Sequence, residues 1–370
     1  MTRRSSRTRL FSPINRSSRT ALLALTLAAG SMLAPVSLST ASAQAKWPAA
    51  SAPGTGTNAV RTEPAYGGRT DVDAFIVDMV ARHGFVPAEL EAMFARVRRD
   101  DSVLRLIAPA PTEFRKSWRT YRARFLDPVR IREGVRFWSE NEGWLALASA
   151  RYGVPPEIIV AIIGVETMYG RITGDVRVVD ALSTLAFDYP RRADYFRGEL
   201  EQFLLYVRDE RLDAFSLRGS FAGAIGLPQF MPGSIRRYAI DLDGDGHIDL
   251  RGNAADAIGS VASFLAAHGW RSGEPVVFRA RYDAESRLSP LVEAGIRPQF
   301  TLQDLAGYGV ASIEPVSLDL PLALIDLPNG DDETSYFLGA PNFYVITRYN
   351  RSSFYAMAVH DLARALAEAR

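Results

Sequence analysis

Residues 154–170 constrain the fold more than any other segment of this chain. Pro155 and Pro156 favour the first turn of a helix, because proline has no backbone N–H to lose there and its φ already suits a helix. Nearly every side chain that follows is apolar, as in Ile158, Ile159, Val160, Ile162 and Ile163. A helix that is apolar on all sides has to be enclosed by other elements. The chain therefore needs a core built around this helix.

The remaining apolar periodicity predicts more helices and little β-structure. A helical pattern begins at residue 71. Further helical runs cover residues 131–152, 176–187, 190–209, 254–268 and 352–369, whereas residues 101–130 look irregular. Strand-like runs cover residues 276–282 and 342–349, and the side chains of the second run alternate. We therefore predict a mainly α fold of the α+β type with a small β component.

The N-terminal residues have the order of an export signal. Six arginines and no acidic residue come first, an apolar run follows, and Ala41-Ser42-Ala43 supplies a small-residue cleavage site. Residues 1–43 are therefore predicted to be a cleaved signal peptide, because the apolar run is short for a membrane span of about 20 residues. Residues 44–70, rich in proline, glycine and small polar side chains, are predicted to form a linker. We expect a periplasmic protein of the cell envelope with no stable membrane span.

Composition excludes several classes of site and partner. The sequence has no cysteine, which excludes disulfides and thiolate nucleophiles and leaves stability to the hydrophobic core. Loss of the signal peptide changes the formal charge from +1 to −5, and the remaining basic residues are scattered. Nucleic acid is therefore not an expected partner. The histidines lie far apart in the sequence, which argues against a zinc site.

Glu166 stands near the end of the apolar helix, in the sequence Gly164-Val165-Glu166-Thr167. Ionisable residues rarely have apolar surroundings unless they are paired or used. Burial raises the pKa of a carboxyl, which suits a general acid at neutral pH. A structural glutamate that pairs with an arginine or caps a backbone group explains the same pattern. The helix alone leaves both interpretations open.

Three further motifs follow in chain order. Residues 220–232 contain glycines and prolines that predict a tight turn. Residues 241–249 form an acidic loop, and residues 348–352 are followed closely by Tyr355. Together with the Glu166 motif, these segments resemble the lytic murein transglycosylase B family, the B-type lytic transglycosylases of peptidoglycan. Four motifs in the same order make the resemblance far more specific than any one of them.

The resemblance implies a fold and a set of site residues. It implies a lysozyme-like catalytic core at residues 151–370, preceded by an N-terminal helical region at residues 71–150. Glu166 is implied to be the catalytic residue, with no cofactor for catalysis. The implied sugar-binding residues are Ser220, Gln229, Tyr349, Asn350 and Tyr355. Core packing of the tyrosines and a tight helix-packing joint at the glycines are the structural alternatives.

The acidic loop matches the start of a calcium-binding loop. Acidic residues occupy positions 1, 3 and 5, and glycine occupies position 6. The match fails at position 12, where Gly252 replaces the usual glutamate, and the resemblance implies a ligand from Asp256 instead. The predicted ligands of this structural Ca²⁺ are Asp241, Asp243, Asp245, His247 and Asp256. A solvated acidic turn is the alternative.

The predicted chemistry needs only one carboxyl, whereas ordinary glycosidases usually use two. The resemblance implies that Glu166 protonates the MurNAc–GlcNAc β-1,4 bond and then takes the proton of the MurNAc C6 hydroxyl, which leaves a 1,6-anhydroMurNAc end. One alternative is a hydrolytic muramidase in which Asp175, Asp180 or Asp188 is the second carboxylate. Another is a non-catalytic scaffold that binds peptidoglycan. Product mass tests the first alternative and Glu166→Gln tests the second. The expected partners are peptidoglycan glycan strands and other enzymes of cell-wall complexes.

Overall fold

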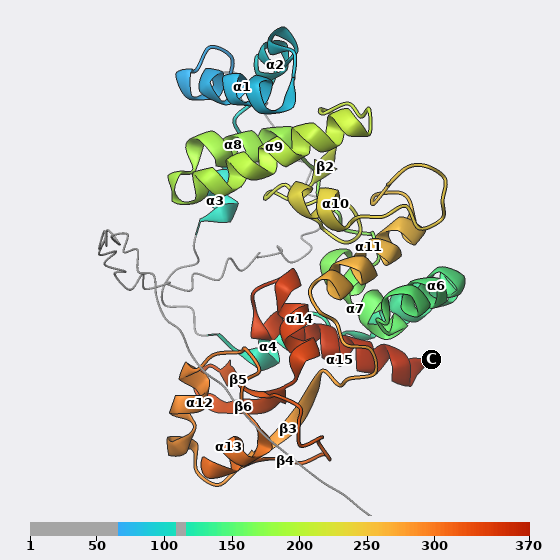
Figure 1. Ribbon diagram of the computed structural model, residues 1–370, viewed down its shortest axis with the longest axis vertical. Helices are drawn as coiled ribbons and strands as arrows, with labels where there is room; N and C mark the ends of the chain where they lie inside the picture. The colour runs from blue at the N-terminus through green and yellow to red at the C-terminus, as the bar shows by residue number, and fades with distance from the viewer. Residues whose placement is uncertain (1–65, 109–115) are drawn as a thin grey trace, which may run out of the picture. The chain divides into compact units, whose positions relative to one another are not determined.

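A computed structural model describes residues 66–108 and 116–370 (Figure 1). The predicted signal peptide, residues 1–43, lies outside the described residues, as does most of the predicted linker. The linker was predicted to extend to residue 70, but Tyr66 is only 1% exposed and its hydroxyl donates to Asp188 Oδ2 at 2.5 Å. The average composition of a segment rich in glycine and proline does not reveal that one of its aromatic residues is buried.

Helices form most of the described structure. They are α1 (Thr70–His83), α2 (Pro87–Phe94), α3 (Asp101–Ile107), α4 (Trp118–Arg122), α5 (Pro128–Glu140), α6 (Glu142–Tyr152), α7 (Pro156–Thr167), α8 (Val178–Asp188), α9 (Ala193–Asp209), α10 (Pro232–Tyr238), α11 (Ala254–Ala267), α12 (Ser289–Glu293), α13 (Leu302–Gly307), α14 (Pro341–Tyr349) and α15 (Ser353–Ala369). The helical runs predicted between residues 131 and 268 and at the C-terminus are confirmed. Residues 101–130 were predicted to be irregular, but the described part of this segment contains α3, α4 and the start of α5. The helices α3 and α4 are short and begin at the side-chain caps Asp100 and Ser117.

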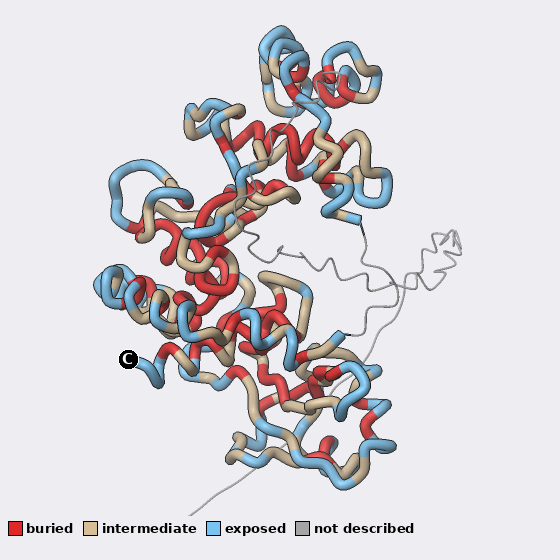
Figure 2. The backbone as a smooth tube through the Cα atoms, turned by 180° about the vertical axis from the view of Figure 1, so that it is seen from behind, coloured by how far each residue is buried: buried red, intermediate tan, exposed pale blue. Residues whose placement is uncertain are grey.

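Helix α7 is the centre of the hydrophobic core, as predicted. Every residue from Ile158 to Ile163 is at most 4% exposed. The helix packs against α5, α6, α11 and α15, and buried residues, red in Figure 2, run through this part of the chain. The helix ends at Thr167 and not at Gly170, because Met168 and Tyr169 adopt left-handed backbone conformations.

Apolar helices in the described residues are too short to cross a membrane singly. The pair α6 and α7 reaches the required length and composition only when the two are taken together, and the chain bends by 114° between them. The bend follows from Gly153, which has a φ of 70°, and from the two prolines that start α7.

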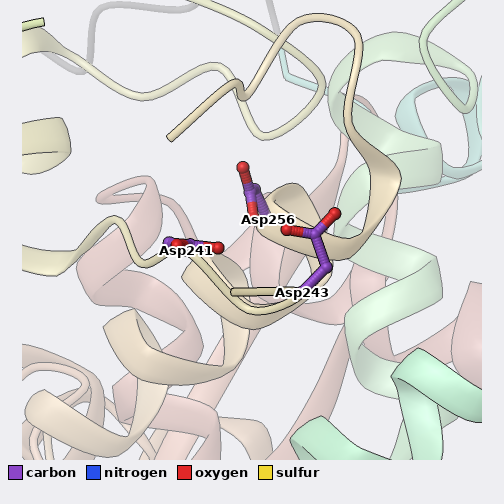
Figure 3. A group of neighbouring side chains, drawn as sticks. All are labelled: Asp241, Asp243 and Asp256. Carbon is purple, nitrogen blue, oxygen red and sulfur yellow. The ribbon is translucent and has the colours of Figure 1, made fainter. Parts of the chain in front are cut away.

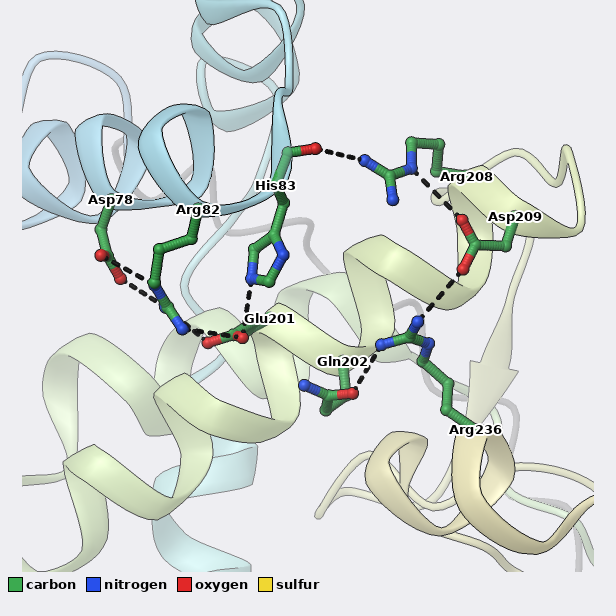
Figure 4. Close-up of polar contacts among 8 residues, drawn as sticks. All are labelled: Asp78, Arg82, His83, Glu201, Gln202, Arg208, Asp209 and Arg236. Carbon is green, nitrogen blue, oxygen red and sulfur yellow. Dashed lines mark hydrogen bonds and ion pairs between the residues drawn. The ribbon is translucent and has the colours of Figure 1, made fainter.

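A polar network joins α1 to α9 and α10 (Figure 4). Arg82 Nη2 lies 2.7 Å from Glu201 Oε2, and His83 Nε2 lies 2.9 Å from Glu201 Oε1. Arg208 donates to the His83 carbonyl at 2.8 Å, and Arg236 extends the network to α10. Each exposed ion pair contributes little to stability, so the network mainly orients the N-terminal helices on α9.

The small β component has two antiparallel sheets. One pairs β1 (Val176–Arg177) with β2 (Arg218–Gly219), and the other has four strands in the order β4-β3-β6-β5. Its strands are β3 (Val277–Tyr282), β4 (Val310–Ser312), β5 (Ala323–Asn329) and β6 (Asp332–Gly339). A second hydrophobic core contains Leu288, Leu291, Leu305, Leu322 and Leu338. The predicted strand at 276–282 is confirmed, and so is the mainly α fold. The hairpin β5–β6 was missed because Pro328 interrupts its first strand and polar residues open its second.

The strand predicted at residues 342–349 is wrong, because this segment is helix α14. Pro341 occupies the first turn, where proline favours a helix. Asn342, Val345 and Ile346 are all buried. Residues from both alternating sets of side chains therefore face the interior, whereas a half-buried strand would bury only one set. The Asn342 amide also donates to the carbonyls of two residues in the loop before β3. Burial by neighbouring elements decided this segment, and local alternation did not.

Candidate active site

Glu166 lies in the last turn of α7 and receives a hydrogen bond from a second buried helix. Tyr355, in the first turn of α15, is 2% exposed, and its hydroxyl donates to Glu166 Oε1 at 2.7 Å. Ser352 caps α15 and accepts from the Tyr355 backbone N–H. Two helices that are far apart in the sequence thus fix the donor against the carboxyl.

Burial controls the protonation of Glu166. Removal from water disfavours the carboxylate and raises the pKa of Glu166 to about 7, although the hydrogen bond from Tyr355 acts in the opposite direction. Burial and the neighbouring Glu166 also raise the pKa of Tyr355 well above 10, so its hydroxyl keeps its proton. A carboxyl of this kind can give up or accept a proton at neutral pH.

Tyr349 ties the end of α14 to the glycine- and proline-rich segment at residues 220–232. Its hydroxyl donates to the Pro228 carbonyl at 2.5 Å, and its ring packs edge-on against Phe264 with centroids 4.9 Å apart. Tyr349 and Tyr355 stack nearly parallel, with centroids 6.3 Å apart and planes 13° apart. The two predicted tyrosines therefore lie side by side near Glu166.

The segment at residues 220–232 is a tight loop held by its own side chains. Ser220 Oγ accepts from the Ala224 backbone N–H at 3.0 Å. Gln229, at a φ of 50°, donates to the carbonyls of Thr173 and Gly226. These bonds leave the Ser220 hydroxyl proton and the Gln229 carbonyl oxygen as the groups that a ligand can use.

Thr167 connects this loop directly to α7, the helix that carries Glu166. Its hydroxyl donates to the Leu227 carbonyl at 2.9 Å and accepts from the Gly170 backbone N–H at 3.0 Å. Because Thr167 follows Glu166 in the chain, the loop is anchored one residue from the carboxyl. Asn350 lies just beyond α14 with an extended backbone, and its carbonyl accepts from Ser352.

Tyr121 is a site residue that the sequence did not reveal. Its ring on α4 packs against Phe125 and Phe354, and burial together with the nearby Glu166 raises the pKa of Tyr121. The hydroxyl therefore stays protonated beside the carboxyl. Tyr121 lies in the segment predicted to be irregular, and no local motif marks it.

Three carboxylates of the acidic loop meet in one small volume (Figure 3). One oxygen from each of Asp241, Asp243 and Asp256 lies within 4.8 Å of the others. Asp256 is fully buried and accepts from the backbone N–H groups of Leu242 and Asp249 at 3.0 and 2.8 Å. The predicted ligands Asp245 and His247 are exposed and do not belong to this group. Three converging carboxylates suit a hard divalent cation such as Ca²⁺.

Comparison with known proteins places the chain in a family. A family model described as the transglycosylase SLT domain matches residues 67–364. The chain is also 47% identical over 304 residues to the membrane-bound lytic murein transglycosylase B of Escherichia coli strain K12. The matched residues cover 80% of this chain and 82% of the relative. The chain belongs to the lytic murein transglycosylase B family.

Solved structures of this family have the same fold. The soluble lytic transglycosylase SltB1 of Pseudomonas aeruginosa is 49% identical with a TM-score of 0.76, over 81% of this chain and 99% of that one. The Escherichia coli lytic transglycosylase Slt35 in complex with calcium is 45% identical with a TM-score of 0.75, over 83% of this chain and 96% of that one. The predicted lysozyme-like core is confirmed, and this member of the lytic murein transglycosylase B family is an enzyme that acts on peptidoglycan.

Proposed function

We propose that Glu166 carries out both proton transfers of glycan cleavage, first as acid and then as base. The observation that carries this proposal is the hydrogen bond from Tyr355 to a carboxyl whose pKa burial raises to about 7. Protonated Glu166 gives its proton to the oxygen between MurNAc C1 and GlcNAc as that bond breaks. The carboxylate then takes the proton of the MurNAc C6 hydroxyl while its oxygen bonds to C1, which closes the 1,6-anhydro ring. Proximity of the C6 hydroxyl replaces a second carboxylate.

The positions of the other acids support a single catalytic carboxyl. Asp180 accepts from the Arg98 backbone N–H and pairs with Arg177. Asp188 binds the Tyr66 hydroxyl and pairs with an arginine near the start of α1. Asp175 is exposed in the loop before α8. Two of the three acids that a muramidase mechanism would recruit therefore hold the N-terminal region in place.

The remaining predicted contacts form the sugar-binding part of the proposal. We assign substrate binding to Ser220, Gln229, Tyr349, Asn350 and Tyr355. Tyr349 is only partly buried and offers a flat apolar ring to a sugar, and the open groups of the 220–232 loop offer hydrogen bonds to hydroxyl and acetamido groups. Tyr355 also orients Glu166.

Product mass tests the mechanism. Purified enzyme acting on sacculi is expected to release fragments that end in 1,6-anhydroMurNAc, each lighter by one water than the corresponding hydrolysis product. Mass spectrometry before and after borohydride treatment checks this, because an anhydro end has no reducing group. Fragments with a reducible, hydrated end would contradict the proposal and favour the muramidase alternative.

We also propose that the acidic loop binds Ca²⁺ through Asp241, Asp243 and Asp256, with Asp245 and His247 drawn in from the exposed side of the loop. The geometry of three carboxylates supports this, as does the calcium complex of Slt35. The role is structural. The Leu227 N–H donates to the Leu250 carbonyl at 2.8 Å, which links the acidic loop to the loop anchored on Thr167.

We further propose that the protein is exported and that the signal peptide is removed after residue 43. The order of basic, apolar and small residues at the N-terminus supports this, together with a substrate that lies in the cell wall. The intact mass of protein purified from the envelope checks it. A mass that retains residues 1–43 would contradict the cleavage.

A further inference from the structure

The chain reverses sharply immediately after the catalytic turn. Met168, Tyr169 and Gly170 follow one another with φ values of 52°, 60° and 85°. Left-handed backbone is unfavourable for residues with a side chain, so surrounding contacts have to hold this reversal in place. The reversal brings the Tyr169 ring back onto α7, the helix that it has just left.

The Tyr169 ring occupies a space that two glycines leave open. A Cβ atom added to Gly164 on α7 would lie 2.6 Å from Tyr169 Oη, and one added to Gly134 on α5 would lie 2.3 Å from the same oxygen. The ring also stacks on Phe137 of α5, with centroids 5.6 Å apart and planes 30° apart. The ring therefore fills the gap between α5 and α7 two residues before Glu166.

A second contact from α5 holds the same turn of α7. Arg130 Nη1 donates at 2.6 Å to the Gly164 carbonyl, which also accepts from the Met168 backbone N–H at 3.1 Å. The Tyr169 hydroxyl is buried and has no hydrogen-bond partner among the described residues. Packing contacts thus hold the ring, and its hydroxyl contributes no hydrogen bond within the described residues.

We infer that Tyr169 is a positioning residue: its ring, clamped between Gly134 and Gly164, fixes the last turn of α7 and so aims the Glu166 carboxyl. Tyr355 on α15 donates to that carboxyl, and Tyr349 on α14 and Tyr121 on α4 lie near enough for Glu166 to raise the pKa of each. These three groups stand on other helices, so a small rotation of the last turn of α7 misaligns Glu166 with all of them at once. The inference rests on the proposed catalytic role of Glu166.

Kinetics on soluble, uncross-linked glycan strands test the inference. Tyr169→Leu is expected to lower kcat about 10- to 100-fold and to leave KM within about twofold, because misplacement of a reacting group lowers the rate and not the binding of a long strand. Tyr169→Phe, which keeps the ring, is expected to keep both constants within about twofold. Tyr169→Met, which fills the gap with a flexible chain, is expected to fall between the two and serves if Tyr169→Leu does not fold.

A double-mutant cycle identifies the clamp itself. Gly164→Ala is expected to lower kcat as Tyr169→Leu does, because its Cβ displaces the ring. The double variant is expected to lose no more than the worse single variant, since both remove one contact. Additive losses would overturn the inference, and so would a Tyr169→Leu enzyme with normal kcat or a Tyr169→Phe enzyme as slow as Tyr169→Leu.

Glu166→Gln separates the two levels of the proposal. If Glu166→Gln is inactive while Tyr169→Leu is normal, only the positioning role fails. If Glu166→Gln cleaves glycan strands at the normal rate, the proposed function fails. Thermal unfolding of each variant shows whether it is folded when its rate is measured.

Discussion

Glu166→Gln is expected to lower kcat for glycan-strand cleavage by about 10³-fold or more, with little change in KM. General acid–base catalysis by a placed group contributes about 10²- to 10⁴-fold, and here one carboxyl serves both steps. The amide of glutamine keeps the size of the side chain and can still accept from Tyr355, so binding and folding are preserved. Release of soluble fragments from sacculi measures the loss.

Glu157→Gln is the matched control, because it makes the same change at the other end of α7. It is expected to leave kcat unchanged. If Glu157→Gln and Glu166→Gln were equally active, Glu166 would not be the catalytic acid.

The pH dependence of Glu166 follows from its raised pKa. The acid step needs the protonated form, so kcat is expected to fall as pH rises above about 7. The folded protein binds a proton more tightly than the unfolded chain, whose carboxyl titrates near 4.5. This contribution to stability is fully present below pH 4.5 and is lost as pH rises through 7.

Glu166→Gln is therefore also expected to be more stable than wild type at pH 8. Because one pKa unit corresponds to about 1.4 kcal/mol and Glu166 keeps some exposure, we expect a gain of about 1–3 kcal/mol. At pH 4 the two proteins should unfold alike. Thermal or urea unfolding at both values of pH checks this, and equal stability at pH 8 would show that Glu166 is not destabilised by burial.

Asp256→Ala is expected to lower the free energy of unfolding by about 2–3 kcal/mol without calcium and to abolish the stabilisation by calcium. The substitution removes the acceptor of two backbone N–H groups, those of Leu242 and Asp249. A buried donor left without a partner costs about 1–3 kcal/mol. Urea unfolding with EDTA and with millimolar Ca²⁺ measures both effects.

Asp243→Ala separates calcium binding from the support of the loop. Asp243 is exposed and accepts from the side-chain amide of the half-buried Asn253 and from the Asp245 backbone N–H, so its loss should change stability without calcium by less than about 1 kcal/mol. It should still weaken stabilisation by Ca²⁺, which depends on ligand affinity through mass action. If Ca²⁺ raised the stability of wild type and of both variants equally, the acidic loop would not be the calcium site.

Much of the site could be predicted from the sequence, because its parts are local. An all-round apolar run predicts a buried helix, so α7 was recognisable without coordinates. The helix alone left the catalytic and the structural interpretation of Glu166 open, and the resemblance of four motifs in chain order favoured the catalytic one. The tight loop at residues 220–232 could also be predicted locally, from its glycines and prolines. The strand β3 was likewise predicted from a local strand-like run.

Tertiary packing decided the parts that no local pattern encodes. Alternation favoured a strand where α14 forms, because helix and strand periods are hard to separate when both faces of a segment are buried. Tyr121 lies near Glu166 only because the short α4 packs against the start of α15. The Asp256 carboxylate lies beside those of Asp241 and Asp243, because α11 carries Asp256 back under the loop. Asp245 is closer in the sequence but does not belong to this group. Such contacts depend on how helices dock, and docking is set by the shapes of surfaces distant in the sequence.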